Sequence, residues 1–271
     1  MNKIIDAHVH TYPESVAEKA AKNLGEFYNV TVQCSGTYDD LKRQAVETQT
    51  VGFFLLAVAT APRQVVKLNT KTAELVKLSR AQGFETIGFG GMHQDYAEVR
   101  SEVARCETLG LAGIKIHPDI QQVDIDDPRL FPLYDELQSR GMKLYLHMGD
   151  ERPQYRYSRP SRLAKVLDMF PGLVVIAAHF GGYRAWDEAK EYLWGRENVW
   201  YDASSTFWDV DTKKATEFVR GCGVENVLYG SDYPVIRLED HLALFMKLDL
   251  TEDERKAILY ENAKRFMALC R

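Results

Sequence analysis

Short apolar runs alternate with amphipathic stretches along the whole chain. An apolar run of strand length predicts a buried β-strand. The sequence predicts eight strands, at Lys3–His8, Val51–Ala59, Thr86–Gly91, Ala112–His117, Lys143–His147, Val174–His179, Val199–Ala203 and Val227–Gly230. Most of the stretches between them have the period of a surface helix. The clearest predicted helices are Asp39–Thr48, Val65–Gln82, Tyr96–Leu109, Arg129–Arg140, Arg162–Phe170, Ala185–Leu193 and Thr212–Gly221.

This alternation predicts the fold class. Strands that alternate with helices indicate βαβ units and a parallel sheet, and eight such units predict a single α/β domain, a closed (β/α)8 TIM barrel. We expect this one domain to span residues 1–271. An open doubly wound sheet is the alternative, but it normally carries a glycine-rich phosphate turn after its first strand. Here the first strand runs into His8 and His10 instead.

Two connecting segments are longer than the loops of a minimal barrel. An insertion at Pro13–Thr37 follows the first strand and has a helical pattern near Ser15–Phe27, and a polar loop at Gly149–Ser161 follows the fifth strand. Loops of this length in a compact domain are usually functional or disordered. Near the C-terminus, Thr251 and Glu254 form a capping-box pattern that predicts the start of a last helix, Glu252–Leu269.

Composition and charge restrict the partners. The chain has 271 residues, of which 45% are hydrophobic and 27% charged, and its net charge is −5. A mildly acidic chain lacks the basic surface typical of nucleic-acid binding, so we expect no nucleic-acid partner. The four cysteines form no CxxC pair, and neither a signal peptide nor an apolar run of about 18 residues is visible. We therefore expect a cytoplasmic protein with no membrane partner.

His8 and His10 lie two residues apart at the end of the first predicted strand. Alternate side chains of a strand share a face, so both imidazoles can reach one ion. The HxH pattern is a weak signal by itself, because two surface or capping histidines would produce it as well.

Further side chains of the same kind mark the ends of other strands. His93, His117, His147 and His179 each lie at or just beyond the C-terminal end of a predicted strand, and Asp232 follows the eighth strand. The active sites of (β/α)8 barrels lie at the face that these strand ends form. So many imidazoles on one rim favour a metal or catalytic site over isolated structural histidines.

Six short motifs carry a resemblance to a known family. They are Asp-Ala-His-Val-His (6–10), Gly-Ile-Lys-Ile-His-Pro (113–118), Leu-His-Met-Gly (146–149), Ala-His-Phe-Gly-Gly (178–182), Gly-Ser-Asp-Tyr-Pro (230–234) and Ile-Leu-Tyr-Glu-Asn-Ala-Lys-Arg (258–265). With these motifs the chain resembles the amidohydrolase superfamily, and more narrowly its amidohydrolase-related branch. That branch contains metal-dependent hydrolases, aminocarboxymuconate-semialdehyde decarboxylase and related decarboxylases. The resemblance is specific for the fold and the metal site and unspecific for the substrate.

The resemblance implies a role for each matching residue. His8, His10, His147 and Asp232 would hold one divalent metal ion, and His179 would be the catalytic histidine. Imidazole and carboxylate ligands suit Zn²⁺, with Mn²⁺ or Fe²⁺ as alternatives. The metal would lower the pKa of a bound water towards ~7, and Asp232 could then take the proton of that water.

Four further residues near this site have two interpretations each. Lys115 matches the position of a carboxylated lysine that bridges two metals in binuclear members of the superfamily. We favour one metal, with Lys115 as a buried cation beneath the metal site. The alternative is a lysine side chain that extends out of the barrel. We expect His117 to face the substrate or to support a ligand. His93 could contact the substrate or order its loop, and Asp6 could support a ligand or cap a turn.

Substrate contacts are expected from the loops. Arg152, Arg156 and Arg159 follow the fifth strand, and arginine suits the bidentate recognition of a carboxylate. Aromatic residues such as Tyr12 and Trp208 would cover an apolar or planar body of a small molecule. The alternative is that several of these arginines are solvated or contact another subunit. A homodimer is expected from the resemblance alone.

These features predict a metal-dependent hydrolase of an ester, lactone or amide that acts through a metal-activated water. The alternative on the same site is non-oxidative decarboxylation of a small carboxylic acid. A TatD-type nuclease ranks lower, because the segment 115–118 replaces the glutamate that this family has near the end of its fourth strand. A non-catalytic metal-binding protein also ranks lower, because every expected ligand is present.

Overall fold

A computed structural model describes residues 3–270 and contains eight parallel strands in one sheet, which follow one another in chain order. Their bounds are β1 Ile4–Val9, β2 Thr50–Leu56, β3 Glu85–Gly91, β4 Gly113–Ile116, β5 Lys143–Leu146, β6 Val175–Ala177, β7 Val199–Asp202 and β8 Val227–Leu228. The eight predicted strands are therefore confirmed in number and order.

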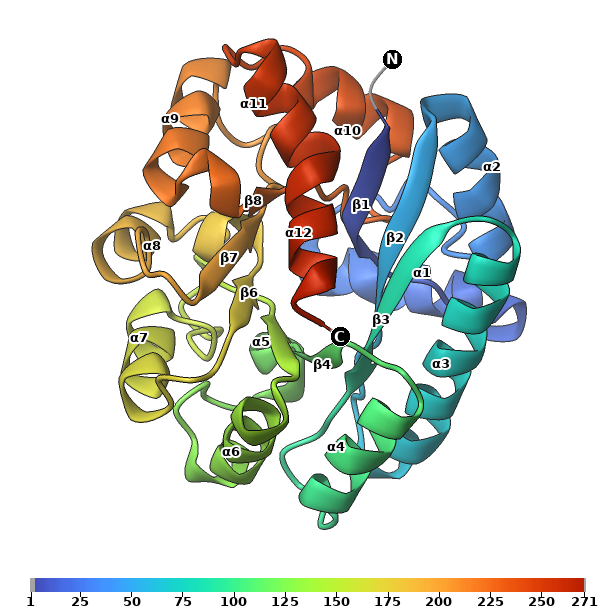
Figure 1. Cartoon of the computed structure of the whole chain (residues 1–271), viewed down its shortest axis with the longest axis vertical. Coiled ribbons are helices and arrows are strands. Elements are labelled where there is room, and N and C mark those ends of the chain that lie inside the picture. The colour runs from blue at the N-terminus through green and yellow to red at the C-terminus, as the bar shows by residue number, and fades with distance from the viewer. Residues whose placement is uncertain (1–2, 271) are drawn as a thin grey trace.

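Backbone hydrogen bonds join the first and the last strands. The Ala7 N–H donates to the Tyr229 carbonyl oxygen over 2.8 Å, and the Asp232 N–H donates to the His8 carbonyl oxygen over 2.9 Å. The sheet therefore closes on itself, and the helices surround it (Figure 1). The protein is a (β/α)8 TIM barrel, as the pattern of the sequence predicts.

The outer helices agree with the sequence to within three residues at each end. They are α2 Tyr38–Thr48, α3 Val65–Ala81, α4 Val99–Thr108, α6 Phe131–Arg140, α7 Pro160–Met169, α8 Trp186–Tyr192 and α9 Thr212–Cys222. Two helices add to the predicted set, the short α5 (Pro118–Gln121) and α10 (Leu238–Phe245).

Several strands end earlier than predicted, and one cause is visible in β6. Predicted to run to His179, it ends at Ala177. His179 and Phe180 have φ values of 58° and 55°, in the left-handed region, where a strand cannot continue. The backbone turns here and places His179 beyond the strand end.

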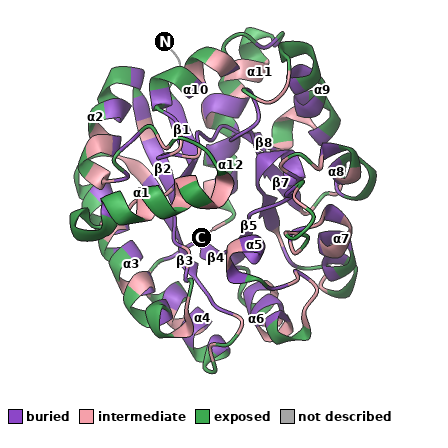
Figure 2. Cartoon of the chain, turned by 180° about the vertical axis from the view of Figure 1, so that it is seen from behind, coloured by how far each residue is buried: buried purple, intermediate pink, exposed green. Residues whose placement is uncertain are grey.

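Two helices cover the two ends of the barrel. At one end, α12 (Asn262–Ala268) places the Phe266 ring 5.7 Å from Phe54 and 5.2 Å from Trp200, and it crosses the front of Figure 1. The predicted last helix is continuous through α11 (Glu252–Lys256), the π-helical segment Ala257–Glu261 and α12, and it starts with the predicted capping box. At the opposite end, α1 (Glu14–Tyr28) lies across the barrel (Figure 2). The predicted insertion after the first strand thus covers the mouth of the barrel.

The barrel interior changes from apolar to polar along its axis. Phe54, Phe89 and Tyr145 are buried and contact one another in this order, with ring centroids 6.2 Å apart in a tilted pair and 5.2 Å apart in an edge-to-face pair. The Tyr145 hydroxyl group donates to Asp202 Oδ2 over 2.6 Å. An apolar floor therefore supports a polar layer at the end of the barrel that α1 covers.

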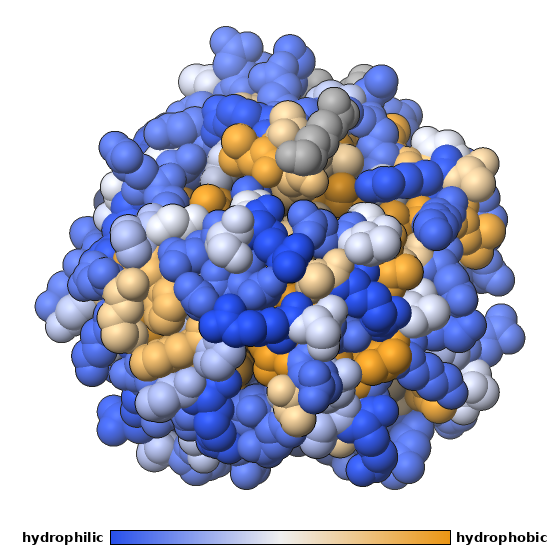
Figure 3. Space-filling view, turned by 60° about the horizontal axis from the view of Figure 1, so that its bottom comes forward, coloured by the Kyte–Doolittle hydropathy of each residue, from blue (hydrophilic) through white to orange (hydrophobic). Residues whose placement is uncertain are grey.

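The outer surface is mainly polar where it is seen in Figure 3, with hydrophobic residues in separate patches among hydrophilic ones. Within residues 3–270, no helix has the length and apolar character needed to cross a membrane. The outward helix faces thus match the amphipathic pattern of the sequence.

Candidate active site

His8 and His10 meet at the C-terminal end of β1. The strand is irregular here, because the three steps from Asp6 to Val9 match only two steps along β2. Such a bulge redirects side chains. The Nε2 atoms of the two histidines lie 3.2 Å apart, so both imidazoles face one point, as the strand period predicts.

Asp232 completes this group from the other side of the barrel seam. Its Oδ1 atom lies 3.4 Å from Nε2 of His8 and 4.0 Å from Nε2 of His10. Burial would raise the pKa of Asp232, but His8, His179 and His10 hold it below its ordinary value. A carboxylate oxygen and two imidazole nitrogens therefore converge.

In both imidazoles Nδ1 is the outer nitrogen, which faces away from Asp232, and its hydrogen-bond partner shows where the proton lies. His8 Nδ1 lies 3.0 Å from Asp202 Oδ2, and His10 Nδ1 lies 3.0 Å from the Leu56 carbonyl oxygen. Burial would raise the pKa of Asp202, but His8 and the neighbouring groups hold it well below its usual range, so it is a carboxylate. Both partners can only accept hydrogen bonds, so each Nδ1 carries a proton, and in the neutral imidazole this leaves a lone pair on Nε2.

Three lone-pair donors, from His8, His10 and Asp232, thus lie close together with no proton between them. Such donors repel one another unless a cation lies among them. Histidine ligands of metals typically donate their other N–H to a carboxylate or a carbonyl, as these two do. The residues present therefore fit a divalent metal.

His179 and His147 extend the cluster in the same way. His179 Nδ1 lies 3.2 Å from the Ser204 carbonyl oxygen, and His147 Nε2 lies 3.2 Å from that of Gly149. Their inner atoms, His179 Nε2 and His147 Nδ1, are 3.1 Å apart. The His179 ring stacks on that of His8 with centroids 5.1 Å apart. His179 therefore lies between His8 and His147, and it links His147 to the group of His8, His10 and Asp232.

Burial keeps three of these imidazoles neutral. Loss of solvation lowers the pKa of His10 to about 3 and that of His179 to about 4. It also lowers the pKa of His147 well below its usual value. At neutral pH these imidazoles are neutral, and a neutral imidazole can bind a metal or accept a proton.

The end of β7 holds two supporting residues. Ser204 Oγ lies 3.0 Å from His8 Nδ1 and 2.9 Å from His179 Nδ1, and it donates to Asp202. Sequence analysis did not single out Asp202 or its partner Tyr145. The available signal was the position of Asp202 near the end of a predicted strand, because other strand ends supplied the candidate ligands.

His117 has the opposite protonation. Its Nδ1 accepts the Ile120 N–H over 3.3 Å, so Nε2 carries the proton and donates to the Tyr28 oxygen over 2.7 Å. Its ring stacks on His147 at 3.9 Å. Although His117, Asp119 and His147 lie close enough to hold an ion, this protonation makes His117 a hydrogen-bond donor.

Lys115 and Asp6 each lie two residues before a histidine at the end of the same strand. Lys115 Nζ is buried 4.4 Å from the centre of the Tyr145 ring and has no hydrogen-bond partner among the described residues. Burial lowers its pKa to about 8. Asp6 Oδ1 accepts the N–H groups of His8 and Ser231, so it holds β1 and the segment after β8 in place.

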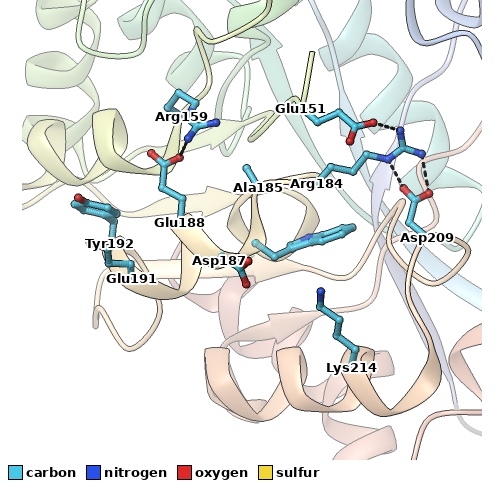
Figure 4. Close-up of a pocket in the computed structure, with 11 residues that line it drawn as sticks. Glu151, Arg159, Arg184, Ala185, Asp187, Glu188, Glu191, Tyr192, Asp209 and Lys214 are labelled. Carbon is cyan, nitrogen blue, oxygen red and sulfur yellow. Dashed lines mark hydrogen bonds and ion pairs between the residues drawn. The ribbon is translucent and has the colours of Figure 1, made fainter. Parts of the chain in front are cut away.

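Two of the loop arginines form ion pairs. Arg152 binds Asp150 through two nitrogens, at 2.9 and 2.6 Å, and donates to the Phe27 carbonyl oxygen. Arg159 pairs with Glu188 in a surface pocket that Figure 4 shows, where neighbouring charges are also paired. Within residues 3–270, neither guanidinium has a contact with the histidine cluster.

The remaining candidates occupy different positions. Tyr12 is half-buried, and burial raises its pKa to about 12, with Asp232 as a second cause. His93 accepts the Asp95 N–H over 3.2 Å and so orders its loop. Arg156 is exposed, and the Trp208 side chain is 38% exposed. Of these four, Tyr12 alone has an electrostatic link to the cluster.

Comparison with known proteins identifies the family of the chain. Residues 5–269 match the family model described as amidohydrolase. An alignment over 116 residues gives 31% identity to 2-amino-3-carboxymuconate-6-semialdehyde decarboxylase of Dictyostelium discoideum. It covers 35% of this chain and 32% of the relative.

Two solved structures share the fold over nearly their whole length. One is 5-carboxyvanillate decarboxylase from Sphingomonas paucimobilis, with TM-score 0.75, 17% identity and 99% of each chain covered. The other is a dihydroxybenzoic acid decarboxylase from Polaromonas, with bound manganese, TM-score 0.74 and 18% identity; 100% of this chain and 98% of that chain are covered. From the barrel, the cluster at its mouth and the match over residues 5–269, the chain belongs to the amidohydrolase family.

Proposed function

We propose that the protein is a metal-dependent, non-oxidative decarboxylase of small carboxylic acids. The observation that carries the proposal is the 31% identity to a decarboxylase of the same family over 116 residues. Decarboxylases among the solved structures of the same fold support it. Hydrolysis, the first expectation from the sequence, becomes the second candidate.

We propose His8, His10, His147 and Asp232 as the metal ligands. The support for His8, His10 and Asp232 is the close approach of their ligand atoms. His147 is added from the resemblance to the family, and its Nδ1 atom lies 3.1 Å from His179 Nε2. A divalent ion in this position would act as a Lewis acid towards the oxygen atoms of the substrate. Zinc suits three imidazoles and one carboxylate, and manganese is the alternative, since a structural neighbour binds it.

His179 would handle the proton. Its Nδ1–H donates to the Ser204 carbonyl oxygen, so the Nε2 lone pair is free to take a proton from the substrate or from solvent. When the bond between the substrate carbon and its carboxylate breaks, CO2 leaves and the electron pair stays on that carbon. His179 would then deliver the proton to the carbon, which balances the reaction.

The same neutral His179 also supports the second candidate. An imidazole that is neutral at pH 7 can accept a proton from a water that attacks an ester or lactone. The two reactions differ in their products, because decarboxylation releases CO2 whereas hydrolysis adds water and releases none.

The experiment is a substrate screen with metal removal and replacement. We expect CO2 release from a hydroxylated aromatic or unsaturated carboxylic acid, loss of this activity after dialysis against a chelator, and recovery with Zn²⁺ or Mn²⁺. Lactones and esters form the parallel panel. Hydrolysis of that panel without CO2 release would overturn the decarboxylase and favour the second candidate.

Asp232→Asn is the variant that tests the site. Asparagine tolerates the left-handed backbone at this position, where φ is 66°, but its amide has no negative charge for a cation. We expect CO2 release to fall at least ~100-fold, because even groups that only support a ligand change affinity or activity ~10–100-fold. A variant with wild-type activity and metal content would refute the ligand assignment.

The wider expectations remain proposals of the same kind. We propose one domain over residues 1–271 and a small-molecule substrate, with no nucleic-acid partner. The cytoplasmic location is supported by four free cysteines, Cys34, Cys106, Cys222 and Cys270. The homodimer is proposed by resemblance to the family.

A further inference from the structure

Tyr28 extends from the C-terminal end of α1 into the mouth of the barrel. Its hydroxyl oxygen lies 2.7 Å from His117 Nε2 and 3.2 Å from His147 Nε2. The helix crosses this end of the barrel in Figure 2. A residue of the insertion, remote in sequence from the strand ends, thus reaches the histidine cluster.

Both imidazole nitrogens that face Tyr28 carry protons. His117 Nδ1 accepts the Ile120 N–H, which leaves the proton on Nε2. His147 Nε2 faces the Gly149 carbonyl oxygen at 3.2 Å, which requires a proton on this nitrogen as well. The Tyr28 oxygen therefore accepts, and its own O–H has no acceptor among residues 3–270.

We propose that Tyr28 binds the substrate by donating its O–H to an anionic oxygen, one oxygen of the substrate carboxylate. This inference rests on the proposed function, because it assigns a role at the same site. His117 and His147 fix the position of the phenol oxygen, so the free proton is held at the cluster. Tyr28 thereby selects substrates with an anionic oxygen.

Arg152 cannot easily take this role in the structure. Asp150 already neutralises its guanidinium, and the Phe27 and Tyr155 rings lie 4.7 and 4.1 Å from it. The arginine holds the end of α1 instead. The anionic group of a substrate thus meets the tyrosine rather than the arginine that the sequence suggested.

The test is calorimetric binding of 2,6-dihydroxybenzoate to the zinc-loaded protein, with resorcinol as the analogue without a carboxylate. The Tyr28→Phe variant removes only the hydroxyl group. We expect it to bind the carboxylate about 10–100-fold more weakly, as for the loss of a hydrogen bond to a charged group, and resorcinol with unchanged affinity.

Tyr155→Phe is the matched control, because the Tyr155 ring also packs on Phe27, with centroids 4.9 Å apart, and within residues 3–270 its hydroxyl group makes no hydrogen bond to the cluster. Binding should stay within twofold of wild type. Equal or tighter binding of the carboxylate by Tyr28→Phe would overturn the proposal, as would a wild-type protein that does not prefer the carboxylate over resorcinol. Carboxylate binding through Tyr28, together with no CO2 release from any carboxylic acid of the substrate screen, would instead overturn the proposed reaction and leave this inference standing.

Discussion

At the scale of single residues, the hydrogen-bond acceptor of each imidazole determines which nitrogen faces the site. Asp202 and the carbonyl oxygens of Leu56, Gly149 and Ser204 each accept one outer N–H. A histidine so held cannot rotate to offer its protonated nitrogen without losing a buried hydrogen bond, which costs about 1–3 kcal/mol. The cluster is therefore prepared for a cation before one arrives.

The absence of a side chain at Gly230 allows His8 to occupy its position in the cluster. A Cβ atom at this position would lie 2.9 Å from the His8 Cβ, so β1 and the segment after β8 would have to separate. We expect Gly230→Ala to weaken metal affinity at least ~10-fold and to cost about 1–3 kcal/mol of unfolding free energy. Competition with a chelator measures the first effect and chemical denaturation the second.

The control for this variant is Gly172→Ala. An added Cβ there meets only the Gln138 side chain, at 3.3 Å, and that side chain can move away. Unchanged metal affinity in both variants would contradict the close approach of Gly230 and His8 as a requirement of the site.

The sequence predicted part of this residue-scale arrangement. The period of a strand places His8 and His10 on one face, and the strand ends point to His147, His179 and Asp232. The protonation of each imidazole could not be predicted, because it depends on acceptors such as Leu56 and Gly149 that are backbone atoms. Backbone carbonyls have no signature in a sequence.

At the scale of elements, α1 and the loop after β5 act together. The sequence predicted the helix of the insertion but not its place across the mouth, because long-range packing determines where an insertion lies. Arg152 connects the two elements, because it pairs with Asp150 of the loop and donates to the Phe27 carbonyl oxygen in the last turn of α1.

Arg152→Ala should therefore loosen α1. The variant removes a bidentate ion pair, a hydrogen bond to the helix and three ring contacts. We expect limited proteolysis within α1 to become about 10-fold faster, which corresponds to about 1.4 kcal/mol less free energy for local opening. Arg156→Ala, an exposed arginine of the same loop, is the matched control. Equal cleavage rates in the two variants would show that Arg152 does not hold the helix.

At the scale of the whole molecule, the order of strands and helices was predictable because the fold repeats one simple unit. The eight βα units alternate along the chain, and a parallel barrel with its site at the strand ends follows from that alternation. The exact ends of the strands did not follow. The left-handed backbone of His179 and Phe180, for example, is a local conformation without a hydrophobic pattern.

The folded protein should lose stability in acid. Burial lowers the pKa of His10 to about 3 and that of His179 to about 4, so the unfolded chain, with histidine pKa values near 6.5, binds more protons between these limits. His117, His147 and His241 shift in the same direction.

Three carboxyl groups act in the opposite sense. Burial raises the pKa values of Asp6 and Asp119 to about 6 and also raises that of Asp124, so the folded state binds protons there that the unfolded state does not. The histidines outnumber these carboxyls, so unfolding free energy should rise with pH from about 4 to 6.5. Denaturant titrations of metal-free protein at several pH values measure this slope, and a flat or falling dependence would contradict the burial of neutral histidines.

The closure of the barrel between β1 and β8 has a consequence for the order of assembly. His8 and His10 are synthesised before Asp232, which follows His10 by 222 positions (232 − 10) in the sequence. An ion held by all three would close a loop of this length, and closing a long loop removes more conformational freedom from a chain than closing a short one. A growing chain could not bind the ion with its full ligand set until the eighth strand had been synthesised, so acquisition of the metal would coincide with the completion of the barrel.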